Sequence, residues 1–180
     1  LFLVFEGNID FYINSAHYSI SKNQFILVNS NEIHSIEALR ENYTIVLQIP
    51  QETFEAFREE EYILFKSTRY EEDSELISLI KNMYRSYSEK QYGYELEVKS
   101  YFYKLLYILI TKYKEKDIDK EIIRQNRHLE KLSNITEYIQ ENYKKDITLD
   151  SVASKFGFSP TYLSRMFQKY AKINYKSYLL

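Results

Sequence analysis

The chain has 180 residues, of which 44% are hydrophobic and 28% charged, and its formal net charge is -2. This length allows one large domain together with a small one, and the composition is that of a soluble globular protein. The absence of cysteine excludes a disulfide framework, a thiolate nucleophile and a zinc-thiolate cluster, and it fits a cytoplasmic location. No apolar run approaches the roughly 20 residues of a membrane span, so we expect no membrane partner.

The first fifty residues have the alternating apolar pattern of short β-strands. The stretch LFLVFEGNIDFYI has two apolar runs around Gly7-Asn8, and HYSISKNQFILV has two around Lys22-Asn23, so each pair predicts a β-hairpin. A further apolar run, YTIVLQI, ends at Pro50. About four to five short strands in this region predict an antiparallel barrel or sandwich rather than a parallel sheet.

Beyond this region the hydrophobic period lengthens to about 3.6 residues, which is typical of α-helices. Asp73 and Ser74 can cap a helix that runs to about Lys90. A longer helix is expected over about 94–114, and its apolar face is wide enough to contact two neighbours. These two helices are expected to complete a first domain that spans residues 1–115.

The segment 116–128 is charged and only weakly periodic, so we expect it to link the first domain to a helical second domain, 129–180. Residues 129–180 contain eight Lys or Arg against five Asp or Glu, a net charge of +3, which leaves -5 for the rest of the chain. Residues 152–180 contain five Lys or Arg and no acid. This basic end suggests a polyanionic partner, although five cations are also common on a solvated surface.

The stretch ITLDSVASKFGFSPTYLSRMF predicts two short helices joined by a sharp turn. Thr148 can cap the first helix, and Ser159, followed by Pro160, can cap the second. Gly157 can adopt the positive φ that the turn needs, and Ala153 is small where the two helices would touch. The apolar residues expected to hold the second helix are Val152, Phe158, Leu163, Met166 and Phe167.

Packing of those apolar residues would turn the polar residues of the second helix outward, where a DNA major groove could meet them. Arginine can bond two acceptors of a guanine edge, threonine and serine can reach a base or a phosphate, and lysine suits phosphate. The same pattern would also arise in a three-helix packing unit whose polar surface is merely solvated. The residues expected to contact DNA are Thr161, Ser164, Arg165, Gln168, Lys155, Lys169 and Lys172.

The stretch ITLDSVASKFGFSPTYLSRMFQKYAKINYKSYL resembles the first helix-turn-helix of AraC-type transcription regulators. The stretches LFLVFEGNIDFYI and HYSISKNQFILVNSNEIHSI resemble the cupin-like sensor barrel that precedes the DNA-binding part in many members. The resemblance implies an α+β chain with an N-terminal cupin-like antiparallel β-barrel, following helices, and an all-α helix-turn-helix subdomain. It also implies a transcription regulator with double-stranded promoter DNA, a small-molecule effector, a second copy of the chain and RNA polymerase as partners.

By position, Thr161, Ser164 and Arg165 fall where AraC-type regulators place base-contacting residues on their first recognition helix. Two features depart from the pattern of those regulators. Lys172 stands where they usually have the glycine that ends the recognition helix. The chain also stops at Leu180, inside the expected connecting helix, so we expect it to be a fragment that lacks the second helix-turn-helix.

A small effector would lie inside the barrel and contact alternate strand residues, although the same residues could equally form a hydrophobic core. The residues expected to contact it are Phe2, Val4, Phe11, Ile13 and His34. For dimerisation, the helix over 94–114 offers one stripe of side chains, which could instead close the barrel. The residues of this stripe are Tyr101, Leu105, Ile108 and Lys112.

The alternative function is a cupin-type enzyme or sugar-binding module whose C-terminal helices are only structural. A cupin metal site needs several histidines and a glutamate, and only His34, of the three histidines, falls at a cupin-like position. Further ligands would have to lie upstream of Leu1. No Ser-His-Asp set or carboxylate pair stands out, so we expect no catalysis, metal or cofactor, and the basic end of the chain favours the regulator.

Overall fold

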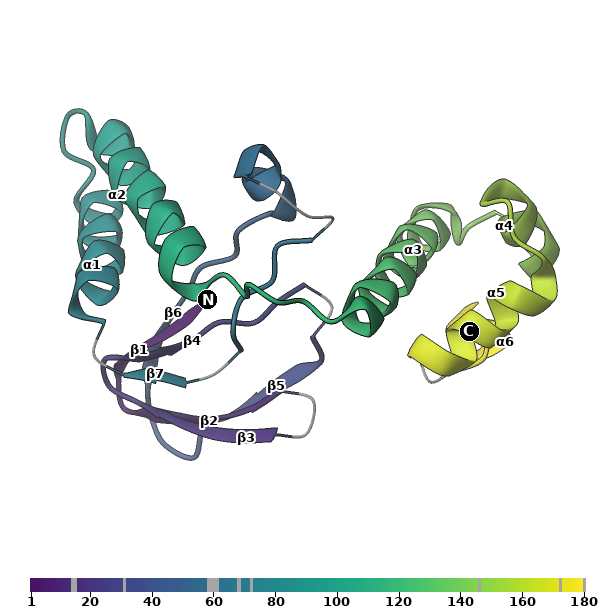
Figure 1. Cartoon of the computed structure of the whole chain (residues 1–180), viewed down its shortest axis with the longest axis horizontal. Helices are drawn as coiled ribbons and strands as arrows, with labels where there is room; N and C mark the ends of the chain where they lie inside the picture. The colour runs from purple at the N-terminus through teal and green to yellow at the C-terminus, as the bar shows by residue number, and fades with distance from the viewer. Residues whose placement is uncertain are drawn as a thin grey trace. The chain divides into compact units, whose positions relative to one another are not determined.

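The computed structural model describes residues 1–13, 16–30, 32–57, 62–67, 69–71, 73–145, 147–171 and 173–179. The chain forms two compact units, Leu1–Asp117 and Ile118–Leu180 (Figure 1). Among the described helices, none is both long and apolar enough to cross a membrane.

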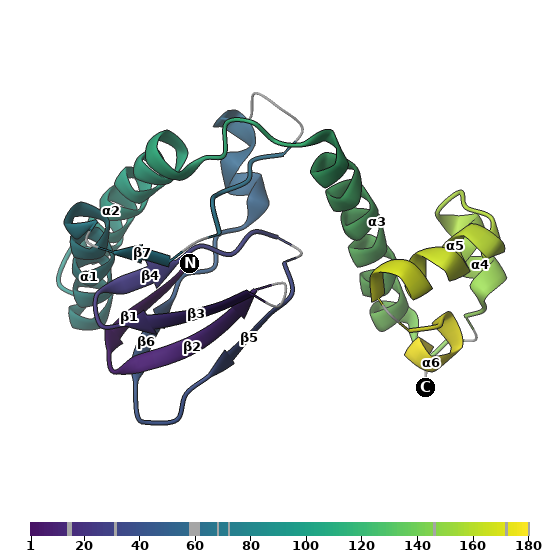
Figure 2. The same ribbon diagram turned by 60° about the horizontal axis from the view of Figure 1, so that its bottom comes forward.

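The N-terminal unit is built on two antiparallel sheets that pack face to face (Figure 2). One sheet has the strand order β6-β1-β4-β7 and the other has the order β3-β2-β5. The strands are β1 (Phe2–Glu6), β2 (Asn8–Ile13), β3 (Ala16–Ser21), β4 (Gln24–Ile26), β5 (His34–Glu37), β6 (Tyr43–Val46) and β7 (Arg69–Glu71). The predicted α+β class with an antiparallel N-terminal region is confirmed, and the described strands form two sheets rather than one closed ladder.

The two predicted hairpins are wrong. Gly7, at φ +79°, lies between β1 and β2, but β1 pairs with β4 and β6, whereas β2 pairs with β3 and β5. Lys22-Asn23 likewise lies between β3 and β4, which belong to different sheets. Both turns therefore carry the chain from one sheet to the other. This crossing lets Val4 and Ile9, on either side of the first turn, bury their side chains in the same apolar layer between the sheets.

Two helices cover the outer face of the four-stranded sheet, α1 (Ser74–Glu89) and α2 (Tyr94–Ile108) (Figures 1 and 2). Asp73 caps α1 by accepting a hydrogen bond of 3.0 Å from the Leu76 amide. The chain continues from α2 into a π-helical turn, η2 (Leu109–Tyr113), and a 3-10 helix, η1 (Gln51–Phe57), precedes β7. Helix α1, and α2 taken together with η2, begin and end close to where capping and periodicity predict.

The inward face of α2 corrects the predicted dimerisation stripe. Leu105 and Ile108 are 0% and 1% exposed, and they pack in the core between the helices and the sheet. Tyr101 lies partly buried against the same core. Lys112 forms ion pairs of 3.3 Å with Asp73 and Glu75 at the start of α1. The apolar residues of the stripe thus close the core of the unit, which is the alternative stated above.

The C-terminal unit is helical (Figure 1). Its elements are α3 (Lys120–Asn142), α4 (Leu149–Lys155), α5 (Pro160–Met166), the π-helical turn η3 (Phe167–Ala171) and α6 (Tyr175–Leu179). Residues 120–128, which the sequence analysis places in a linker, are the first turns of α3. Asp119 caps this helix by accepting a hydrogen bond of 2.7 Å from the Glu121 amide, and this polar start has little apolar periodicity to reveal it.

Candidate DNA-binding helices and ligand pocket

The turn between α4 and α5 is fixed by backbone hydrogen bonds. Gly157 has φ +71°, and its amide donates to the Ser154 carbonyl at 3.2 Å. The Phe158 amide donates to the Ala153 carbonyl at 2.8 Å. This pair of bonds around a left-handed glycine is a Schellman motif, which satisfies the last carbonyls of α4 and directs the chain into α5.

Helix α5 is held by capping at its start and by packing along one face. Ser159 accepts a hydrogen bond of 3.2 Å from the Tyr162 amide, and Pro160 occupies the first helical position. Ala153 is fully buried where α4 contacts α5. The predicted apolar contacts are confirmed: Val152, Leu163, Met166 and Phe167 are buried with α3 residues Leu132, Ile135 and Ile139, and Phe158 packs against them.

The opposite face of α5 presents polar side chains to solvent. Thr161, Arg165 and Gln168 are exposed, and Ser164 is half-buried. Within the described part of the chain, no salt bridge or hydrogen bond of the Arg165 guanidinium is found. Its five donors are therefore available to an external acceptor.

Two of the predicted phosphate-binding lysines rest on aromatic rings while remaining exposed. The Lys155 ammonium lies 4.7 Å from the centre of the Tyr138 ring, and that of Lys169 lies 5.1 Å from the Tyr170 ring. Such contacts contribute only about 0.5–1 kcal/mol at exposed sites, so both charges stay accessible to an anion. Lys172 lies outside the described residues.

His128, which the sequence did not indicate as a site residue, contacts α5 and the turn that follows it. Its ring stacks on Tyr170, with 5.2 Å between ring centres, and its Nδ1 lies 3.2 Å from the Tyr162 hydroxyl. Burial lowers the pKa of His128, and the positive charge of Lys131 lowers it further. The spacing of His128 to Leu132 and to the later apolar residues of α3 is helical, and that spacing could have placed it on the face toward α5.

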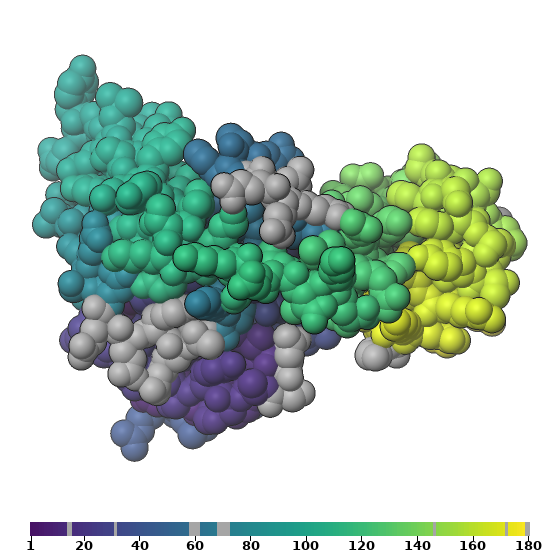
Figure 3. Space-filling view, in the orientation of Figure 1, coloured from purple at the N-terminus to yellow at the C-terminus, as the bar shows by residue number. Residues whose placement is uncertain are grey.

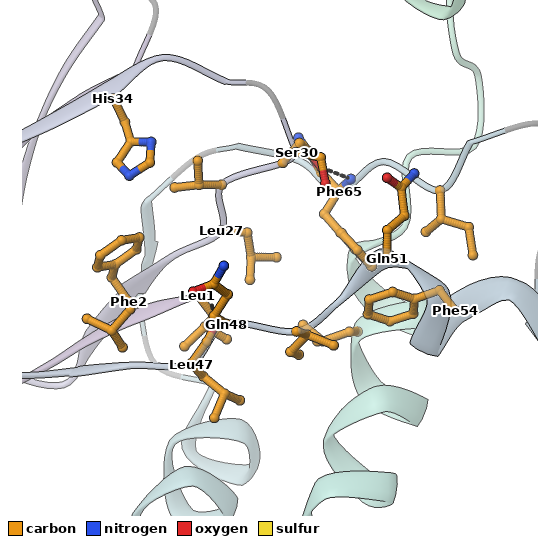
Figure 4. A pocket seen from close by; sticks show the side chains of 16 residues that line it. Leu1, Phe2, Leu27, Ser30, His34, Leu47, Gln48, Gln51, Phe54 and Phe65 are labelled. Atoms are coloured by element: carbon orange, nitrogen blue, oxygen red, sulfur yellow. Dashed lines mark hydrogen bonds between the residues drawn. The ribbon is translucent and has the colours of Figure 1, made fainter. Parts of the chain in front are cut away.

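A cavity of about 340 Å³ opens in the N-terminal unit (Figure 4). Its lining comes from the start of β1, the loop after β4, the start of β5, the end of β6 with the segment that follows it, η1, the segment 62–67 and η2. The lining residues are Leu1, Phe2, Leu27, Val28, Asn29, Ser30, His34, Val46, Leu47, Gln48, Ile49, Gln51, Phe54, Ile63, Phe65 and Leu109.

Of the five residues expected to contact an effector, Phe2 and His34 line this cavity. Val4, Phe11 and Ile13 do not, and this part of the expectation is corrected, because they fill the apolar layer between the two sheets. Phe11 nonetheless supports the site, since its ring stacks on His34 with 5.6 Å between centres and an angle of 6° between the planes.

Most of the remaining lining residues lie outside the strands, where strand periodicity cannot predict them. Leu47 and Gln48 follow β6 in an irregular segment, Gln51 begins η1, and Phe65 follows residues 62–64, which have no regular structure. No repeating apolar pattern marks such segments. Among the residues that the structure describes, no group of three or more His, Asp or Glu lies close enough together to hold a metal ion.

The chain combines a β-sandwich unit that contains a cavity with a helix-turn-helix unit, which is the architecture of a two-domain regulator. Residues 1–106 match the family of the AraC-like ligand binding domain, and residues 139–179 match bacterial regulatory helix-turn-helix proteins of the AraC family. The chain therefore belongs to the AraC family.

One relative with a similar sequence is the uncharacterized HTH-type transcriptional regulator YijO of Escherichia coli (strain K12). It is 47% identical to this chain over 45 residues, which are 25% of this chain and 16% of YijO. The chain thus spans only a small part of that relative. No solved structure matches the chain significantly.

Proposed function

We propose that this protein is a sequence-specific DNA-binding transcription regulator that responds to a small molecule bound in its N-terminal unit. The observation that carries the proposal is the exposed Arg165, which pairs with none of the described residues, on a helix that is held by a glycine turn and a buried apolar face. Membership of the AraC family supports it. That membership does not favour the alternative, a cupin-type enzyme or sugar-binding module, and we propose no catalytic role.

On DNA, α5 would lie in the major groove with its exposed polar face toward the bases. Arg165 would bond the O6 and N7 acceptors of a guanine, and Thr161, Ser164 and Gln168 would contact neighbouring bases or phosphates. Lys155 and Lys169 would neutralise phosphates on either side, and Lys172 is proposed for the same role by its position in the sequence. The fixed α4–α5 turn would set the angle at which α5 enters the groove.

The outer face of α2 is the surface that we propose for a homodimer. Leu96, Tyr103 and Tyr107 follow one another at helical spacing, and they are 74%, 66% and 59% exposed. The space-filling view shows side chains of α2 at the surface of the N-terminal unit (Figure 3). An apolar stripe of this kind on a helix, opposite the face that packs on its own sheet, is suited to a second copy of the helix.

RNA polymerase is the further macromolecular partner that we propose, because a protein bound at a promoter alters transcription through contact with the polymerase or by obstructing it. The proposed setting is the bacterial cytoplasm, where promoter DNA lies. The family that matches the C-terminal unit is one of bacterial regulators, and this supports both proposals.

Selection of bound sequences from a random duplex library tests the proposal, because the operator does not need to be known in advance. The selected duplex should bind the chain with an affinity that falls as salt rises, since each lysine at a phosphate releases about one counterion. Lys169→Gln should reduce the slope of log K against log salt by about 1. The proposal would be contradicted if the selection gave no preferred sequence, or if the affinity for DNA did not change with salt.

A further inference from the structure

The floor of the cavity in the N-terminal unit is apolar. Leu27, Phe54, Ile63 and Leu109 line it, and each is 6% exposed or less. They come from the loop after β4, η1, the segment 62–67 and η2, so four separate parts of the chain enclose one apolar volume. A ligand that fills this volume must present hydrocarbon to it, because no described side chain of the floor can accept or donate a hydrogen bond.

The rim of the cavity is polar and carries amide, hydroxyl and imidazole groups. Ser30, His34 and Gln48 are exposed, and His34 and Phe54 lie at opposite ends of the cavity (Figure 4). His34 donates a hydrogen bond of 3.0 Å from Nδ1 to the Glu32 carbonyl, which leaves Nε2 of the neutral ring as an acceptor. The rim can therefore bond one polar end of a ligand whose body lies on the floor.

The side chain of Asn29, a polar residue of the lining, already forms hydrogen bonds within the protein. The Asn29 side chain accepts a hydrogen bond of 2.7 Å from the Phe65 amide, and it donates to the Phe65 carbonyl and to the Ser67 hydroxyl at 2.8 Å. These bonds tie the loop after β4 to the segment 62–67. Asn29 thus shapes the cavity, and both of its side-chain N–H groups are already used within the protein.

The described lining residues include no Lys, Arg, Asp or Glu. The nearby Glu32 carboxylate accepts hydrogen bonds from the Asn29 amide and the Ser67 hydroxyl, at 2.7 and 2.6 Å. Among the described residues of the loop 27–33, Glu32 is the one formally charged side chain, and its negative charge would repel an anion.

We infer that the cavity binds an uncharged and mostly apolar small molecule with one hydroxyl or amide at its polar end. This inference deepens the proposed function and rests on it for its regulatory meaning. A sugar fits poorly because several of its hydroxyls would lose their water hydrogen bonds against the apolar floor. A carboxylate or phosphate fits poorly because its charge would be buried without a cation to pair with.

The inference is tested by calorimetric titration of the 180-residue chain with 2-naphthol, 2-naphthoate and glucose at neutral pH. The first two probes share one ring system and differ in charge. We expect 2-naphthol to bind at least roughly tenfold more tightly than 2-naphthoate, and glucose not to bind. Equal or tighter binding of naphthoate, measurable binding of glucose, or no binding of naphthol would overturn the inference.

A charge placed on the rim shows whether the probe lies in this cavity. Val46 lines the cavity and is 56% exposed, so Val46→Arg should fold normally and raise the naphthoate affinity by roughly three- to tenfold. The matched variant Val46→Gln adds bulk and polarity without charge, so the rise in naphthoate affinity should be absent from it. Unchanged naphthoate binding in Val46→Arg would overturn the inference. These titrations contain no DNA, so their failure is separate from a failure of the proposed DNA binding.

Discussion

The hydroxyl of Tyr162 lies 3.2 Å from Nδ1 of His128, and this contact joins the exposed helix α5 to α3 across 34 positions of sequence. The His128 ring also stacks on Tyr170, in the turn that follows α5. A titratable side chain thus contacts both the helix that we propose to meet DNA and the turn that follows it.

This contact predicts a pH dependence of stability. Burial lowers the pKa of His128, and three positive charges lower it further; they belong to Lys131, Lys169 and Arg124. Because the unfolded chain takes up the proton near the ordinary pKa of 6.5 and the folded chain resists it, the folded unit loses stability as pH falls below 6.5. When the pH is lowered from about 7.5 to about 5.5, the thermal midpoint of the C-terminal unit should decrease, and the decrease should be smaller in His128→Gln. An equal fall in both proteins would contradict this.

Replacement of Gly157 tests the geometry of the turn. A Cβ at this position would meet no atom within 4 Å, so the cost of Gly157→Ala comes only from the positive φ. We expect the free energy of unfolding of the C-terminal unit to drop by about 1–2 kcal/mol in urea titrations. Gly157→Asn should lose less, since asparagine tolerates this conformation better. A neutral alanine substitution would mean that the turn differs from the one described.

Leu105 should behave as a core residue and not as a dimer contact. Leu105→Ala removes a fully buried side chain from the layer between α2 and the sheet, so the free energy of unfolding should fall by about 2–5 kcal/mol. Lys99→Ala, at an exposed position of the same helix, should change it by no more than about 0.5 kcal/mol. If Leu105→Ala dissociated a dimer without lowering the free energy of unfolding, the dimerisation surface predicted from the sequence would be correct after all.

The outer face of α2 makes the complementary prediction. Tyr103→Lys places a charge at the centre of the exposed stripe, and sedimentation velocity should show a shift from dimer to monomer with an unchanged thermal midpoint for the monomer. The same change at another exposed apolar residue, Ile36→Lys in β5, should leave the sedimentation coefficient as in the wild type. A dimer that survives Tyr103→Lys would place the interface elsewhere.

The helix-turn-helix could be predicted from sequence because its determinants are local. A capping residue, a glycine in the turn and an apolar residue at each buried position act over a few neighbours, and Thr148, Gly157 and Leu163 each do what their chemistry indicates. The start of α3 was harder to predict, since its first turns are charged and only the cap at Asp119 marks them.

The pairing of the strands and the cavity could not be predicted, because both depend on contacts between distant segments. Gly7 permits a tight turn, but the choice between a hairpin and a crossing is made by where Val4 and Ile9 can both be buried. The cavity is lined largely by irregular segments such as the one that holds Gln48. In these segments neither the strand nor the helix period indicates which side chains meet.

The central claim, that α5 recognises a DNA sequence, is tested most directly by the preference of the protein for its selected duplex over a scrambled one. Arg165→Ala should reduce this preference by about 1–3 kcal/mol, whereas Lys169→Gln should weaken binding to both duplexes equally. Circular dichroism would verify that both variants keep their helices. An Arg165→Ala protein that is folded and discriminates between the duplexes as well as the wild type would contradict the claim.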